Sequence, residues 1–175
     1  MKYIIKLYLL SLILVATPMI AMDGVAVIDM RTAVLSTQAA ADAFKALEED
    51  PDYSANLEEA KSIQADRQAM AEKLQKDFET LSQEQVAEMQ RDIQEKGQEI
   101  EFIIGKVQAK QNQTVEKIFA DINPTLQKIL SELIAAKEVK LLLSQENVLF
   151  SDPDLVLTDD VTSLLDVALA EGQNE

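Results

Sequence analysis

The longest pattern in the sequence is a narrow apolar stripe in which hydrophobic residues recur every three or four positions. It runs from Val86 to Leu133, with weak positions near Gly97 and Gln111. Such a pattern predicts one long helix of the coiled-coil kind, which Pro124 is expected to kink or divide. At about 1.5 Å per residue the helix is too long for a compact domain of this size, so we expect it to project.

A second stripe precedes the first, on a helix expected from Asp52 to Thr80. Ser82 and Gln85 then form a capping-box pattern, which predicts a tight turn between the two helices. Because the remaining faces are polar, we expect an antiparallel helical hairpin that forms an arm over residues 51–123. Two interpretations of its larger apolar residues remain open. They close the seam, or some stay exposed as an adaptable binding surface, and the candidates are Met70, Leu74, Phe78, Met89, Ile93 and Phe102.

The pattern changes at both ends of the mature chain. Residues 24–29 form a β-branched apolar run typical of a strand, and a helical pattern follows over residues 32–47. Residues 138–144 and 147–151 are two short apolar runs that predict a β-hairpin, after which Thr158 is expected to cap a helix over residues 159–170. The whole order predicts a mainly α fold with a small β part, in which residues 22–50 and 124–175 form a body. Three short strands make a small core, so we expect the body to need partner chains.

Residues 1–21 have the three-part pattern of a signal peptide. Lys2 and Lys6 provide the basic region, Leu7 to Val15 the apolar region, and Ala21 is the candidate last residue before cleavage. The alternative is an uncleaved membrane anchor. Residues 7–22 hold only 16 consecutive uncharged residues, fewer than the roughly 20 that a spanning helix needs. We therefore expect cleavage and export to the periplasm.

The composition excludes most catalytic chemistry. The 175 residues include no Cys and no His, and the four Gly are isolated from one another. Disulfides, histidine-based triads, thiolate or histidine metal sites and glycine-rich phosphate loops are therefore excluded. The acidic runs Glu48-Glu49-Asp50 and Asp159-Asp160 could be paired carboxylates or cation ligands, but they are typical of a solvated loop and a helix N-terminus. We expect no enzyme activity, no cofactor and no metal.

The chain is strongly acidic, and the charge is uneven. It has 31 acidic and 16 basic residues and a formal charge of −15, which becomes −17 when residues 1–21 with their two lysines are removed. The acids concentrate in residues 48–59 and 146–175, whereas residues 61–110 are almost balanced. Phosphate recognition needs clustered Lys and Arg, so nucleic acid is not an expected partner.

Three segments, in order, carry a family resemblance: the first strand Val25–Met30 (VAVIDM) with RTAVLST after it, the Gln/Glu/Lys-rich helical middle, and Val139–Leu165 (VKLLLSQENVLFSDPDLVLTDDVTSLL). The chain resembles the Skp/OmpH family of periplasmic chaperones. The resemblance implies a jellyfish-shaped homotrimer whose strands form a small barrel and whose arms enclose unfolded outer-membrane proteins without ATP. It would place six side chains in the barrel, namely Val25, Val27, Leu141, Leu143, Val148 and Phe150.

The tip of the expected arm departs from the basic character common in this family. Residues 78–89 include Glu79, Glu84 and Glu88 but no Lys or Arg. Attachment to lipid through charge is therefore not expected. One further function class stays open, a structural coiled-coil protein of the envelope that spaces or tethers a defined partner. A single stoichiometric partner in a pull-down would favour that class, whereas many unfolded clients would favour the chaperone.

Overall fold

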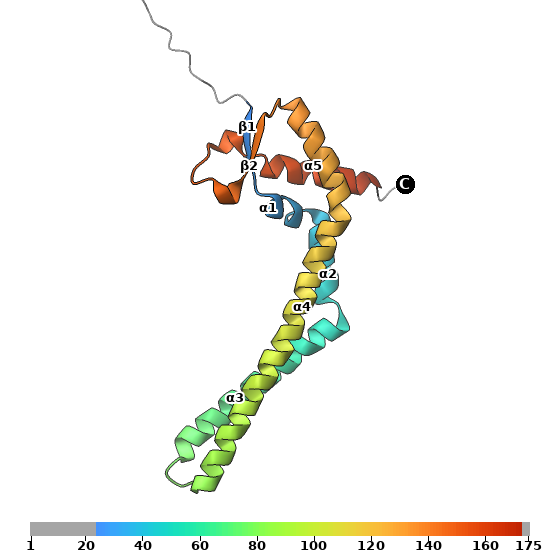
Figure 1. Ribbon diagram of the computed structural model, residues 1–175. Coiled ribbons are helices and arrows are strands. Elements are labelled where there is room, and N and C mark those ends of the chain that lie inside the picture. The colour runs from blue at the N-terminus through green and yellow to red at the C-terminus, as the bar shows by residue number, and fades with distance from the viewer. Residues whose placement is uncertain (1–23, 173–175) are drawn as a thin grey trace, which may run out of the picture.

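The computed structural model describes residues 24–172, so the predicted signal peptide lies outside the described residues. The elements in order are β1 (Val25–Ile28), α1 (Met30–Leu35), α2 (Gln38–Glu48), α3 (Pro51–Asp77), α4 (Gln83–Ala136), β2 (Leu141–Ser144), η1 (Gln145–Asn147), η2 (Pro153–Leu155) and α5 (Thr158–Gly172). Figure 1 shows two parts: a body around the strands, and an arm in which α3 runs beside α4. The predicted fold class, mainly helical with a small β part, is confirmed.

The sheet differs from the predicted hairpin. β2 pairs in parallel with β1, in a register that places Val25 opposite Leu141 and Ile28 opposite Ser144. On the other side of β1, the N–H of Leu157 donates to the carbonyl of Val27 at 2.8 Å. The prediction of a second hairpin strand at residues 147–151 is wrong. β2 pairs with β1 instead, and a 3₁₀ turn directly follows β2. The apolar run after that turn is left without a strand partner in the described chain.

The helix expected over residues 32–47 is two helices. Asp29 caps α1 by accepting from the N–H of Thr32 at 2.9 Å. Thr37 then interrupts the helical path: its hydroxyl donates to the carbonyl of Val34 at 2.8 Å and accepts from the N–H of Ala40, so that it caps α2. A buried hydroxyl satisfied by backbone on both sides favours this break over a continuous helix.

The body core forms where α1, α5 and the last part of α4 pack around β1. Val34, Val161 and Leu165 are completely buried there. Thr158 does begin α5, but its hydroxyl accepts from the N–H of Asp29 at 2.9 Å and so connects α5 to the end of β1. The expected role of Thr158 as the helix cap is therefore replaced by a long-range hydrogen bond.

The arm is built as the stripes predict. Asp50 caps α3 and Pro51 occupies its first turn, where a missing N–H costs nothing. The capping box is confirmed, with Ser82 and Gln85 each accepting from the other's backbone N–H at the start of α4. α4 then continues without interruption for 54 residues, with Pro124 inside it. The body and the arm therefore share one helix, and α3 crosses it on the way to the tip (Figure 1).

Candidate functional site: the helical arm and its tip

The base of the arm is held by a small buried cluster. Leu47 from α2, Tyr53 from α3 and Val107 from α4 pack together, with less than a tenth of each side chain exposed. The Tyr53 hydroxyl accepts a hydrogen bond from the amide of Gln111 at 2.7 Å. Three helices are therefore joined at one level, where the arm leaves the body.

An ion pair lies beside this cluster. The Lys110 ammonium is 3.1 Å from Asp50, the carboxylate that also accepts from the Tyr53 N–H at the start of α3. The Tyr53 N–H, and after it Lys110, holds the pKa of Asp50 below its usual range. Asp29, which caps α1, has its pKa lowered in the same way by the N–H and the hydroxyl of Thr32. The Asp50–Lys110 pair was not foreseen from the sequence, because it depends on how α3 is aligned with α4.

The seam of the arm changes character along its length. Ala60, Ile63 and Ile103 form the last buried layer. In the described stretch between Ile63 and Ile103, which we call the distal arm, no side chain is buried. The two helices are connected there by contacts such as the 3.5 Å pair between Lys96 and Asp66. The distal arm is thus a helical hairpin whose apolar seam is open to solvent.

Six apolar residues were expected as candidates for a binding surface, and all of them lie on the distal arm. Met70, Leu74, Met89 and Ile93 are half-buried in the seam, whereas Phe78 and Phe102 are 57% and 65% exposed. The Lys106 ammonium lies 4.5 Å from the centre of the Phe102 ring, which is within the range of a cation–π contact. The two phenylalanines therefore do not pack into the seam.

The structure brings three of the six candidates together. Leu74, Phe78 and Ile93 line a cavity of about 440 Å³ near the tip, together with Ala71, Gln75 and Glu79. We call this cavity the tip notch. Met70, Met89 and Phe102 lie outside it. Which of the six residues share a cavity depends on how α3 and α4 lie against each other, and the sequence stripes do not specify this.

The expected barrel residues have mixed environments. On β1, Val27 is buried and Val25 half-buried; on β2, Leu143 is half-buried and Leu141 is 51% exposed. Val148 and Phe150 belong to no strand, and the Phe150 side chain is 87% exposed. Leu149, which the sequence analysis did not single out, is completely exposed. Their place in a trimer stays a prediction.

The sequence profile of the family described as "Outer membrane protein (OmpH-like)" matches residues 24–165. The chain belongs to this family. The crystal structure of an OmpH-like protein from Caulobacter crescentus CB15, proposed to be an outer membrane chaperone, is similar over 85% of this chain and 86% of that one, with 20% identity and a TM-score of 0.49. No curated protein matches the sequence.

Membership of the OmpH-like family supports a general chaperone role and a non-enzymatic one. Two carboxylates of the acidic runs have structural roles. Asp50 caps α3, and Asp160 pairs with Lys137 at 2.7 Å. Within residues 24–172, no group of three or more carboxylates could hold a metal ion. None of the helices in this described range is both long and apolar enough to cross a membrane.

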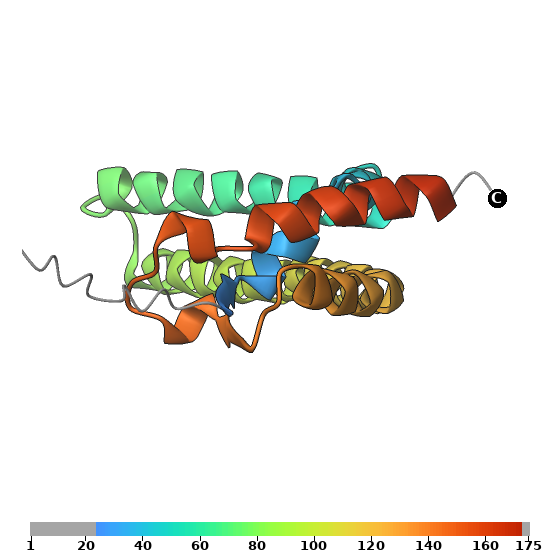
Figure 2. The same ribbon diagram turned by 90° about the horizontal axis from the view of Figure 1, so that it is seen from above.

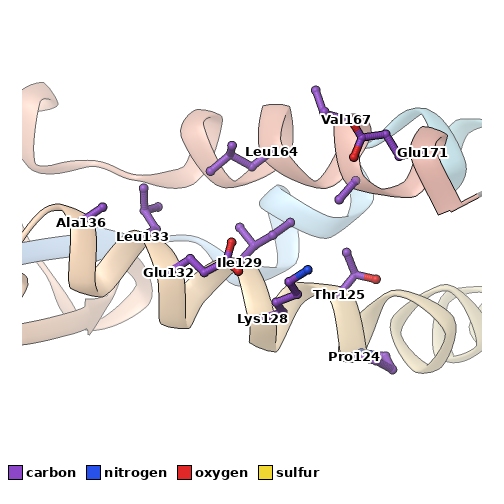
Figure 3. Close-up of a pocket in the computed structure, with 11 residues that line it drawn as sticks. Pro124, Thr125, Lys128, Ile129, Glu132, Leu133, Ala136, Leu164, Val167 and Glu171 are labelled. Atoms are coloured by element: carbon purple, nitrogen blue, oxygen red, sulfur yellow. The ribbon is translucent and has the colours of Figure 1, made fainter.

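The OmpH-like body also contains a groove that the sequence did not predict. It lies between the last turns of α4 and α5 and has a volume of about 770 Å³. Figure 3 shows Ile129 and Leu133 from α4 on one side, and Leu164 and Val167 from α5 on the other. α5 crosses the upper part of α4, as Figures 1 and 2 show. Leu164 and Val167 extend the apolar surface of α5 beyond its buried residues Val161 and Leu165.

Proposed function

We propose that this OmpH-like chain is an ATP-independent holdase of the periplasm. It binds unfolded outer-membrane proteins and prevents their aggregation on the way to the outer membrane. Three chains assemble through their bodies, and the three arms surround the cavity that holds the client. Residues 1–21 direct export and are removed.

The open seam of the distal arm is the observation that carries this proposal. Met70, Leu74, Met89 and Ile93 are only half-buried, and Phe78 projects into solvent beside them. Flexible apolar side chains of this kind adapt to irregular partners, because they can repack at little cost. Many weak apolar contacts retain an unfolded chain without a defined binding sequence. Release follows when the client folds elsewhere, so no nucleotide is required.

The small sheet supports assembly. Among the described residues, β2 has β1 on one side and no strand on the other, so one row of its backbone groups is free to pair. Leu141 and Phe150, more than half exposed in the single chain, lie in and after this strand. A homotrimer that covers them removes apolar surface from water.

Light scattering tests the proposal. A β-barrel protein diluted from urea should stay dispersed at near-stoichiometric trimer, and sedimentation of the same sample should give the trimer mass. The combined variant Phe78→Ser and Phe102→Ser should suppress aggregation several-fold less well. Both side chains are exposed, so the fold should survive.

The matched control is Leu164→Ser with Val167→Ser, which removes two exposed apolar side chains from the body. This control should protect the client as well as the unchanged protein does. Scattering that the unchanged protein does not lower would overturn the holdase proposal. An equal loss of aggregation suppression in both variants would show that the exposed phenylalanines of the arm have no special role in client binding.

A further inference from the structure

The tip notch lies at the acidic end of the arm. Glu79 is one of its walls, and the neighbouring turn and helix ends carry Asp77, Glu84 and Glu88. None of these four carboxylates makes an ion pair within the described residues. All but Asp77 are exposed to solvent. The apolar cavity therefore has one carboxylate in its wall, Glu79, that is unpaired within the described chain, and it lies at an end of the arm where residues 77–90 contain four acids and no Lys or Arg.

The basic residues closest in sequence do not offset this charge. On α3, Lys73 and Lys76 alternate with the notch-lining residues Ala71, Leu74, Gln75 and Phe78. At about 100° per residue they point away from the notch-lining face. On α4, Lys96 is paired with Asp66, and Arg91 lies near Asp92 and Glu95.

Arg67 lies on the same face of α3 as the notch but one turn closer to the body. Its guanidinium packs against Gly97, where an added Cβ would be 3.6 Å from the guanidinium carbon. The notch thus combines an apolar floor, contributed by Leu74, Phe78 and Ile93, with the Glu79 carboxylate in its wall.

We propose that the tip notch selects polypeptide segments in which a large apolar side chain is flanked by Lys or Arg. This deepens the proposed function, on which it rests, by naming the class of client segment that the arm tips prefer. The apolar side chain fills the cavity, whose volume of about 440 Å³ falls in the usual range for binding pockets, about 300–1,000 Å³. The flanking cations lie near Glu79, in the negative field of the acidic end of the arm.

Charge complementarity selects this occupant over two others. An anionic membrane surface would face the same carboxylates and be repelled. A second copy of the tip carries the same charges, so direct association of two tips is disfavoured for the same reason. A segment with both apolar and cationic side chains interacts favourably with the apolar floor of the notch and with its negative charge.

Fluorescence anisotropy with two labelled peptides tests the proposal. Both contain the same Leu and Phe anchors, flanked by Lys in one and by Glu in the other. The Lys peptide should bind at least about fivefold more tightly at low salt, and the difference should shrink as salt screens the charges. Phe78→Ser should weaken both peptides, because it removes part of the apolar floor.

A matched pair of charge variants separates the notch from the total charge. Glu79→Lys changes the notch wall, whereas Glu101→Lys makes the same change at an exposed α4 position outside the notch. Glu79→Lys should abolish most of the preference for the Lys peptide, and Glu101→Lys should keep it. Equal binding of the two peptides, or equal effects of the two variants, would overturn the proposal.

Two further measurements complete the test. In flotation with vesicles that contain anionic lipid, the unchanged protein should stay unbound. If Glu79→Lys binds these vesicles more strongly than the unchanged protein does, the result supports the proposal, because it shows that the carboxylate repels lipid. Binding that Glu79→Lys abolishes would overturn the proposal. If the protein suppresses aggregation but binds both peptides equally, the holdase proposal holds and the selectivity of the notch is refuted. If it prefers the Lys peptide but does not suppress aggregation, the notch selectivity holds and the holdase proposal is refuted.

Discussion

Replacement of Leu165 by Ala should strongly destabilise the body. Leu165 is completely buried in α5, and it belongs to the same core cluster as Val34 and Val161. The change removes three carbon atoms, which at about 0.8 kcal/mol each corresponds to roughly 2.4 kcal/mol of lost transfer free energy. The cavity left in a core that cannot fully collapse raises the expected cost to about 3–5 kcal/mol.

Leu164→Ala is the matched control, because it makes the same chemical change at the adjacent position. The Leu164 side chain is 43% exposed, so its loss should cost no more than about 1 kcal/mol. Urea unfolding followed by far-ultraviolet circular dichroism at one fixed protein concentration measures both free energies. Similar midpoints for the two variants would refute the placement of Leu165 at the centre of the core.

Two other predictions concern the arm base and the start of the sheet. The pKa of Asp50 is lowered from 3.8, so its ionised form stabilises the fold at neutral pH, and this stabilisation is lost as the pH falls through the lower folded pKa. Asp50→Asn should therefore have a lower Tm than the unchanged protein at neutral pH. In acid, the Tm values of the two proteins should converge. Gly24 has a φ of +92° and an added Cβ would lie 2.9 Å from a backbone carbonyl, so Gly24→Ala should cost about 1–3 kcal/mol in urea unfolding. Gly105→Ala, at an open helix position, should instead be neutral or stabilising by up to about 1 kcal/mol.

The arm was predictable because its determinants are local. The stripe from Val86 to Leu133 and the Ser82–Gln85 capping box act within a few turns of helix, and the structure has both. Export, trimer formation and client binding stay predictions. The pairing of Tyr53 with Gln111 was not predictable, because two residues 58 positions apart meet only when the register of the hairpin is fixed.

The error at residues 147–151 has a different cause. A short apolar run satisfies the strand pattern whether or not a partner strand exists. In the structure β2 pairs with β1, which is more than a hundred residues away in the sequence, and no turn signal encodes that choice. The break at Thr37 was readable in principle, because Thr is a common helix cap. The surrounding apolar period obscured it.

α4 gives the molecule the mechanics of a lever. Its 54 residues extend for about 80 Å, from the solvent end of the arm to the layer that contains Leu126 and Leu133. A load applied at the far end is therefore transmitted as torque to the hydrophobic centre of the protomer. Pro124 has no N–H to donate to the carbonyl one turn back, but Ile118 and Ile122 before it and Leu126 after it are packed in the body core. Angular displacement of the arm should thus concentrate where α4 leaves the body core, on the tip side of Ile118.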